Sequence, residues 1–451
     1  MVRTIVIKLS RGFDIRLLGS PEQGLLEAKN SRLFALKPTD VVGIGPIPKL
    51  HKAIGDRVLA GEPLFFDKGS PRIQFGSPVS GEVVEIRRGP KRAITEVVIA
   101  VDAEVAFHQF EKLDVASCSR EQAVDLMLNS GAWTLLKQRP FNTLADPEAT
   151  PRDIFVSCFD TAPLAPDHNM LIKGKESAFQ KGLSVLNKLT SGGVHLGVGP
   201  ESADVFTKAD GVNVTSFSGP HPAGNVGVQI HHLAPINKGD VVWTLKPQDV
   251  AIIGKLFSDG VFDAERTVAV TGDKTKKTGY VKTRIGASVE PMLADNLKHD
   301  HVRCISGNAL SGTQIEKDGF LGLYDDQITV LEEGDKPEFL GWLIPSYKRP
   351  SLSRTFPSFL RPNKEYHVNT NNHGEERAYV MSQQYEKVLP MDLHPQYLIK
   401  SILYGDFEQM EGLGIYEVVE EDLALCEFVC TSKQPVQQIL RAGLDLVRLE
   451  G

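Results

Sequence analysis

The chain has 451 residues, of which 41% are hydrophobic and 24% charged, so it has a globular composition and enough length for three or four domains. Its formal net charge of −7 excludes a general attraction to nucleic acid or to anionic lipid. No apolar run reaches the roughly 18–20 residues that cross a bilayer, and Lys8, Arg11 and Asp14 interrupt the first segment, which argues against a signal peptide. The charged first segment therefore indicates the cytoplasm, and any membrane role would have to come through a protein partner. Because the five cysteines are an odd number and three of them lie far apart, we expect reduced thiols.

The first segment, residues 1–105, is predicted to form a small β-barrel or sandwich. Turn signals near Gly55 and Gly81 separate short apolar strands in "GDRVLAGEPLFF" and "SPVSGEVVEI". These two runs resemble the half-repeats of a biotinyl or lipoyl carrier domain. A working carrier needs a lysine at the tip of the hairpin "DKGSPRIQFG", where Lys68 is the nearest candidate. Because the residues beside it and the hairpin length differ from those of a carrier, a structural role is favoured.

Two segments then alternate between helix and strand patterns. In residues 106–245, Ser119 caps a helix, "DIFVSCFD" is a buried strand, and a helix over 176–193 precedes a strand over 194–199. This order predicts a parallel α/β layer. Residues 246–340 begin with the helical "PQDVAIIGKLFSDG" and continue mainly with strands, which predicts a compact α+β unit.

The last segment, residues 341–451, is predicted to be mainly helical. Both "PMDLHPQYLIKSIL" and "QPVQQILRAGLDLVRLEG" have the apolar spacing of amphipathic helices. Between them, "LALCEFVC" places Cys426 and Cys430 one helical turn apart. That spacing is compatible with metal or cluster ligands, with a redox pair, or with ordinary helix residues.

The most concentrated unusual chemistry lies in "SFSGPHPAGNVGVQIHHLAP", residues 216–235. We call its central part, Gly219, Pro220, His221, Pro222 and Gly224, the proline–histidine loop. The glycines permit close backbone approach, and the prolines stiffen the chain around the histidine. A rigid loop that contacts a ligand or a protein partner is the favoured interpretation, since binding residues concentrate in such loops.

A metal site in the same segment is disfavoured. We expect His231 and His232 to lie in a strand, where adjacent side chains point to opposite faces and do not share an ion. His221 could join one of them, but no Cys, Asp or Glu in the segment completes the ligand set. The chain also has no glycine motif typical of dinucleotide or nucleoside-triphosphate binding.

Several stretches together resemble one family. The barrel runs, "SGAWTLLKQRPF", "SGPHPAG", "VVWTLKPQDVAIIGKLF" and "LALCEFVC" are similar to the NqrA subunit of the bacterial sodium-translocating NADH:quinone oxidoreductase, nearly from end to end. That family is related to the C subunit of Rnf complexes and, more distantly, to the NADH- and flavin-binding subunit of respiratory complex I. Where the family reads "GTHIH", this chain reads "GVQIHH", so Gln229 replaces the first histidine and His231 matches the second.

The resemblance implies a fold for each segment. It implies a carrier-like barrel-sandwich over residues 1–105, a Rossmann-like α/β domain over 106–245 and a β-grasp unit of the soluble-ligand-binding type over 246–340. The helical residues 341–451 would resemble a ferredoxin that has lost its clusters.

Flavin binding by this chain is not expected. The glycine-rich loop of the Rnf-type relatives corresponds to "TLLKQRPF", residues 134–141, where Leu136 and Lys137 replace the paired glycines. Their Cβ atoms would obstruct the approach of a phosphate to the backbone.

Iron–sulfur clusters are not expected either. The two runs of cluster ligands in the relatives fall here on Tyr379, Ser382, Tyr385 and Leu389, and on Glu420, Leu423, Cys426 and Cys430. Two thiolates do not hold a cluster without other ligands. We therefore expect Cys426 and Cys430 to be reduced, helical and free of metal.

The family implies a peripheral subunit of a sodium-pumping NADH:ubiquinone reductase on the cytoplasmic side of the bacterial inner membrane. NADH, FAD, FMN, riboflavin and iron–sulfur centres would belong to partner subunits, and no cofactor would be bound by this chain, although ubiquinone is a possible ligand. The proline–histidine loop is the expected contact if any residues touch quinone or an integral membrane subunit, and a purely structural role for it is an equal alternative. The alternatives are an Rnf-type protein that itself binds flavin and clusters, and a carrier modified on Lys68.

Overall fold

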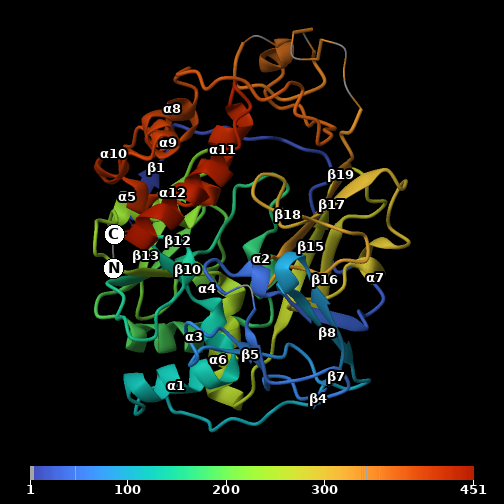
Figure 1. The fold of residues 1–451 in the computed structure, drawn as a ribbon, viewed down its shortest axis with the longest axis vertical. Helices are drawn as coiled ribbons and strands as arrows, with labels where there is room; N and C mark the ends of the chain where they lie inside the picture. The colour runs from blue at the N-terminus through green and yellow to red at the C-terminus, as the bar shows by residue number, and fades with distance from the viewer. Residues whose placement is uncertain are drawn as a thin grey trace.

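The structure is a computed structural model that describes residues 5–45, 47–336, 338, 340–341, 343–344, 346–354 and 356–450. It contains α-helices and strands throughout, with the strands in four sheets, and is therefore a mixed α/β protein (Figure 1). None of the described helices is both long enough and apolar enough to cross a bilayer.

The N-terminal module contains two small sheets of four and three strands, in the orders β2-β8-β7-β4 and β3-β5-β6. Their inward residues share a core in which the rings of Phe65 and Phe75 stack with centroids 4.6 Å apart. The elements are β2 (Leu33–Leu36), η1 (Pro38–Asp40), β3 (Lys49–Leu50), β4 (Arg57–Val58), β5 (Pro63–Phe66), β6 (Gln74–Gly76), β7 (Gly81–Arg88), η2 (Pro90–Arg92) and β8 (Ile94–Val101).

A seven-stranded sheet of order β1-β13-β12-β11-β14-β9-β10 forms the next layer, parallel except at β9 and β10. The strands β11, β12 and β14 are largely buried, as their nearly continuous apolar sequences require. The strands are β1 (Ile5–Lys8), β9 (Lys137–Arg139), β10 (Thr143–Leu144), β11 (Asp153–Ser157), β12 (Val194–Val198), β13 (Asn213–Ser218) and β14 (Val242–Leu245).

Helices cover this sheet. A Cβ at Gly254 would lie 1.8 Å from the carbonyl oxygen of Ala178, so only glycine allows α6 to cross α3 this closely. Ser119 caps α1 as predicted, in a capping box with Gln122, whereas α3 ends at Leu189, before the predicted glycines. The helices are α1 (Arg120–Ser130), η3 (Ala132–Leu135), α2 (His168–Ile172), α3 (Glu176–Leu189), α4 (Asp204–Thr207), α5 (Val226–Leu233) and α6 (Pro247–Asp259).

A five-stranded sheet of order β16-β15-β19-β17-β18 follows, antiparallel except between β15 and β19. The buried guanidinium of Arg266 on β15 joins this sheet to α6 by donating to Asp249, and it also donates to Asp326. The elements are β15 (Glu265–Thr271), β16 (Gly279–Arg284), α7 (Glu290–Leu293), β17 (Val302–Ser306), β18 (Thr313–Ile315) and β19 (Gln327–Glu332).

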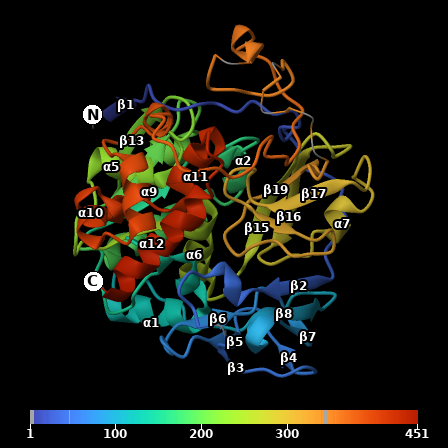
Figure 2. The same ribbon diagram turned by 45° about the horizontal axis from the view of Figure 1, so that its top comes forward.

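The C-terminal part is helical beyond about residue 385 and packs on the seven-stranded layer (Figure 2). Before it, an irregular segment projects from the body at the end of the long axis opposite the N-terminal module, as Figures 1 and 2 both show. The elements are η4 (Pro357–Leu360), α8 (Tyr385–Val388), α9 (Pro395–Tyr404), α10 (Phe407–Gly412), η5 (Ile415–Glu417), α11 (Glu420–Val429) and α12 (Val436–Glu450).

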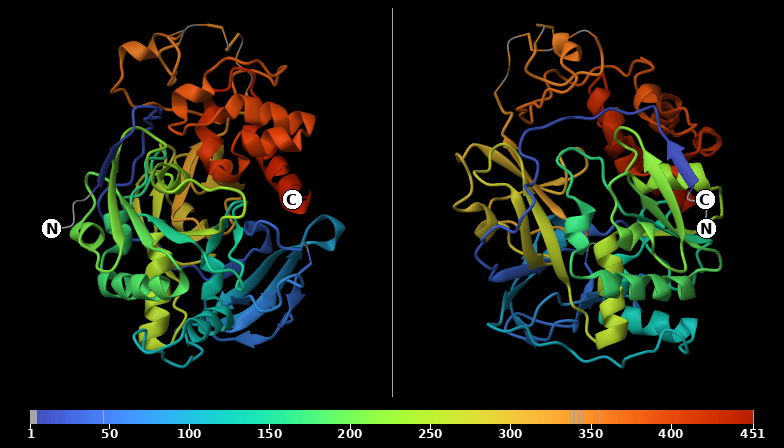
Figure 3. Two further views of the ribbon diagram at one scale, coloured as in Figure 1. Left: turned by 90° about the vertical axis from the view of Figure 1, so that its left-hand side faces the viewer. Right: turned by 180° about the vertical axis from the view of Figure 1, so that it is seen from behind.

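An extended segment, residues 9–32, ties these parts together, and we call it the N-terminal strap. It starts at β1, which pairs with β13 and not with the barrel strands. In the right-hand view of Figure 3 it runs across the molecule toward the five-stranded sheet. Its backbone N–H groups donate to carbonyls of Ser218, His221, Tyr366 and Tyr280 in turn, so one strap touches four parts of the chain.

A buried ion pair fixes the C-terminal helices to the sheet. Arg139 on β9, 1% exposed, donates to Asp422 Oδ2 on α11 at 2.7 Å and to Glu421 Oε1 at 2.7 Å. A Cβ at Gly227 on α5 would lie 2.4 Å from both carboxylate oxygens of Asp422, so the pair needs glycine beside it.

Replacing Arg139 with Met should lower the free energy of unfolding by about 3–5 kcal/mol, because the Asp422 carboxylate would remain buried without its partner. Urea denaturation of the full chain measures this. The matched control is Lys208→Met, whose partner Asp204 lies on the surface with a side chain 77% exposed, and which should cost less than about 1 kcal/mol. Similar losses for the two variants would show that the Arg139–Asp422 pair does not hold the helices in place.

Candidate functional site

The proline–histidine loop connects β13 to α5 and brings its five residues together. Gly219 has a φ of +144°, a value that favours glycine. Gly219 and Pro220 reach the surface, whereas His221, Pro222 and Gly224 are buried. Only the first two residues of the loop are therefore available for an external contact without rearrangement.

His221 holds the N-terminal strap against this loop. Its side chain is 3% exposed, its N–H donates to Asp14 Oδ1 at 2.9 Å, and its carbonyl accepts from the N–H of Phe13 at 2.9 Å. On the other side, Nδ1 lies 3.1 Å from Thr161 Oγ1, which also accepts from the N–H of Gly224. Burial lowers the pKa of His221, and the carboxylates of Asp160 and Asp14 only partly oppose that effect, so the ring is neutral at pH 7.

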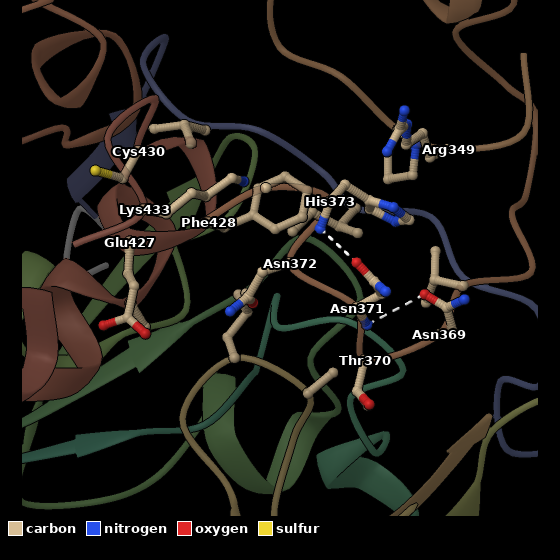
Figure 4. Close-up of a pocket in the computed structure, with 18 of the residues that line it drawn as sticks. Arg349, Asn369, Thr370, Asn371, Asn372, His373, Glu427, Phe428, Cys430 and Lys433 are labelled. Carbon is tan, nitrogen blue, oxygen red and sulfur yellow. Dashed lines mark hydrogen bonds between the residues drawn. The ribbon is translucent and has the colours of Figure 1, made fainter. Parts of the chain in front are cut away.

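A cavity of about 1210 Å³ lies on the far side of the strap (Figure 4). In Figure 4, Asn369, Asn371 and His373 line one side, and Phe428 and Lys433 line the other. The remaining wall includes Ile15 and Leu17 of the strap, Ile305 and Leu331 of the five-stranded sheet, and Arg349, Leu352 and Phe356 of the projecting segment.

The cavity combines an apolar wall with a few polar groups. Residues 369–374, which we call the asparagine turn, form one side. The backbone N–H of His373 donates to Asn371 Oδ1 at 2.6 Å, and this bond orders the turn. Lys433 has a φ of +54°, and burial lowers the pKa of its ammonium. Phe428 stacks on Phe13 of the strap with ring centroids 6.4 Å apart. This lining suits a partly apolar, planar ligand with hydrogen-bond acceptors.

The loop and the cavity share the strap. His221 binds Phe13 and Asp14, and the next residue, Ile15, is part of the cavity wall. The proline–histidine loop therefore lies one layer behind the cavity, where it positions the wall.

The paired histidines do not lie in a strand, so that prediction is wrong. His231 and His232 lie on α5, because a helical hydrogen-bond pattern continues from Val226 to Leu233. Both ring nitrogens of His231 have partners: Nδ1 lies 2.7 Å from Glu417 Oε2, and Nε2 accepts from the N–H of Asp392. His232 Nε2 lies 2.8 Å from the carbonyl of Pro390.

The two cysteines of the C-terminal segment lie at the end of α11. Cys426 is helical, but Cys430 follows the last helical residue and has an extended backbone with a ψ of 116°, which corrects the prediction that both are helical. Both thiols are unpaired and buried. Tyr385, from the other ligand run, donates its hydroxyl to Cys430 Sγ at 3.0 Å, and the Cys426 thiol faces its carbonyl. Burial raises the pKa of Cys426 and of Tyr385.

The stretch aligned with the flavin loop is densely packed. Leu136 is fully buried, and Lys137 Nζ lies 3.9 Å from the ring centroid of Tyr324. Lys68 lies exposed in the turn between β5 and β6. Within the described ranges, no three His, Cys, Asp or Glu side chains are grouped so that they could hold a metal.

Sequence patterns missed the cavity residues. "NTNNHG", residues 369–374, reads as a turn, and Phe428 reads as one apolar helix position among several. Their juxtaposition depends on the packing of the five-stranded sheet against the α11–α12 corner. The concentration of three asparagines and a histidine was the only local signal.

His221 should make stability depend on pH. Because its pKa is below 6.5 in the folded chain, the unfolded chain binds more protons between that lowered value and 6.5, so stability falls as the pH drops through this window. His221→Gln should lose less stability there, as urea midpoints measured from about pH 8 to 5 would show. His299→Gln, at an exposed position, is the control and should follow the unmodified chain. A pH profile unchanged by His221→Gln would contradict this assignment.

Comparison with known proteins identifies the family. Three family models match the chain: the NqrA N-terminal barrel-sandwich hybrid domain over residues 7–102, the NqrA second alpha/beta domain over 118–262 and the NQRA C-terminal domain over 267–317. A solved NAD+-reducing NiFe-hydrogenase in the air-oxidized state is 10% identical, with a TM-score of 0.38 over 77% of this chain and 72% of that chain. This similarity is too low to assign a fold or a function.

Curated relatives match over nearly their whole length. The NqrA subunit of the Na(+)-translocating NADH-quinone reductase of Alcanivorax borkumensis is 39% identical over 451 residues, which cover 99% of this chain and 100% of the relative. Its counterpart from Shewanella frigidimarina is 38% identical over 449 residues, with the same coverage of both chains. From this similarity, the chain belongs to the NqrA family of subunits of the Na(+)-translocating NADH-quinone reductase.

Proposed function

We propose that this chain is a peripheral subunit on the cytoplasmic face of the sodium-pumping NADH:ubiquinone reductase, where it docks on integral membrane subunits and shapes the quinone site. NADH oxidation, the flavins FAD, FMN and riboflavin, and the iron–sulfur centres belong to partner subunits in this proposal. The isolated chain has no redox activity of its own. Its family membership supports the assignment to the complex.

The same relationship gives the finer fold assignment that we propose. Residues 1–105 correspond to a carrier-like module, 106–245 to a Rossmann-like layer and 246–340 to a β-grasp unit. Residues 341–451 correspond to a ferredoxin remnant. The contact of Tyr385 with Cys426 and Cys430 supports the last assignment, since positions from both ligand runs meet there.

The cavity is the observation that carries the quinone proposal. A quinone ring is planar and apolar and accepts hydrogen bonds at its carbonyl oxygens, which matches a wall of Ile, Leu and Phe with amide and ammonium donors. Lys433 is the donor that we assign to one of those carbonyls, because the Asn371 amide already donates to the carbonyls of Gly334 and Lys336. Phe428 is the ring surface beside it.

The residues of the proline–histidine loop have two roles in this proposal. Gly219 and Pro220, which reach the surface, contact a neighbouring protein of the complex. His221, Pro222 and Gly224 are buried and act as positioning residues, because they hold the strap that forms one wall of the cavity.

Replacing His221 with Ala in the assembled complex should reduce quinone reductase activity about tenfold, because the strap would lose a hydrogen-bonded anchor. NADH dehydrogenase activity with an artificial acceptor should not change. His232→Ala, at the C-terminal end of α5 and turned toward Pro390, is the control and should leave both activities intact. If His221→Ala leaves the ratio of the two activities unchanged in a normally assembled complex, the loop does not shape the quinone site.

The purified chain alone should be colourless and contain neither iron nor flavin. Leu136 and Lys137 fill the place of the glycine loop, and two thiolates are too few for a cluster. Visible absorbance spectra and iron analysis measure this. A yellow or brown protein would instead favour the Rnf-type alternative.

A further inference from the structure

The projecting segment has an unusual composition for this acidic protein. We call residues 343–364, of which the structure describes all but 345 and 355, the basic lobe. It contains no Asp or Glu, although the whole chain has a net charge of −7. Its five cations are Lys348, Arg349, Arg354, Arg361 and Lys364.

Large apolar side chains of the basic lobe also face the solvent. In Figures 1 and 3 the lobe with η4 stands clear of the sheets and of the C-terminal helices. The exposed fractions are 54% for Leu343, 48% for Ile344, 48% for Tyr347, 43% for Phe359 and 64% for Leu360. Such a cluster of large apolar groups is uncommon on a free surface and marks an interaction site.

The cations lie directly beside these apolar groups. The Arg361 guanidinium lies 5.5 Å from the ring centroid of Tyr347, and Lys364 Nζ donates to the Tyr347 carbonyl at 2.7 Å. Arg354 lies 5.9 Å from the ring centroid of Phe359. Within the described part of the chain, no carboxylate forms an ion pair with any of these three cations. Arg349 instead lies 4.0 Å from the carboxylate of Glu338.

We propose that the basic lobe binds the surface of an anionic lipid bilayer. Exposed Leu, Ile, Phe and Tyr side chains would enter the headgroup region, while Arg and Lys side chains that no described carboxylate neutralises attract acidic headgroups. The net charge of −7 is an average over the whole chain and does not reflect the positive charge of the basic lobe. The expectation that membrane association needs a protein partner is based on that average and does not apply to the lobe.

A lipid surface fits the lobe better than a membrane protein does. Cytoplasmic loops of integral membrane proteins carry an excess of Lys and Arg, which would repel a lobe without a single carboxylate. The cytoplasmic orientation in this argument rests on the proposed function, whereas binding to lipid does not.

The basic lobe also forms part of the cavity. Arg349, Leu352 and Phe356 line it from the same segment that carries the exposed apolar groups. A lobe held at the bilayer would place the cavity next to the phase in which lipid-soluble ligands dissolve.

Flotation of the full chain with vesicles tests the proposal. The chain should bind vesicles rich in phosphatidylglycerol and not pure phosphatidylcholine vesicles, and added salt should weaken the binding. The double variant Arg354→Gln/Arg361→Gln should bind about 30-fold more weakly, because two cations leave the surface. Leu360→Ser, which keeps the charge, should also weaken binding.

The control carries the same charge change elsewhere. Lys91→Gln/Arg92→Gln lies at the exposed η2 turn of the N-terminal module and should bind anionic vesicles like the unmodified chain. Failure of the unmodified chain to bind anionic vesicles would overturn the proposal, as would equal effects of the two double variants. If the lobe variant leaves vesicle binding unchanged but prevents assembly of the complex, the surface is a protein contact and the lipid proposal is wrong. None of these results bears on His221 or on quinone reduction.

Discussion

The burial of the Arg139–Asp422 pair constrains how the rest of the molecule is assembled. A guanidinium without solvent needs a carboxylate in a fixed place, and that carboxylate lies on α11, far along the chain from β9. The pair therefore fixes the start of α11, and the corner with α12 at the other end of this helix carries Phe428, Cys430 and Lys433. The space between this corner and the five-stranded sheet remains as the cavity. Arg266 and Asp249 perform the same task on the other side, where they hold that sheet to α6.

The candidate site depends on three layers that come from distant parts of the sequence. The proline–histidine loop binds the strap through backbone and carboxylate contacts, the strap supplies an apolar wall, and the asparagine turn faces that wall across the cavity. Each layer supplies only part of the candidate site, so the cavity wall forms only when all three pack together. A small displacement of His221, whose side chain is 3% exposed, would move the strap and with it the part of the cavity wall that the strap supplies.

Local patterns predicted the elements well and their assembly poorly. The cap at Ser119, the strand at "DIFVSCFD" and the helix at "PQDVAIIGKLFSDG" follow from spacing and end signals, which act within a few residues. The histidines on α5 were assigned to a strand because "NVGVQIHH", rich in Gly and β-branched residues, has weak helical periodicity and the helix is stabilised by packing. The loop residues were recognisable from composition, whereas the cavity was not, because its lining depends on contacts between remote segments.

The parallel pairing of β1 with β13 sets an order of events during synthesis. The residues of β1 leave the ribosome long before their partner strand, Asn213–Ser218, so this edge strand must wait while the barrel-sandwich that follows it folds. The N-terminal strap, which follows this strand, then packs against segments that have already folded. Completion of the N-terminal edge is therefore a late event, and a fragment cut after the barrel would keep a strand that has nothing to pair with.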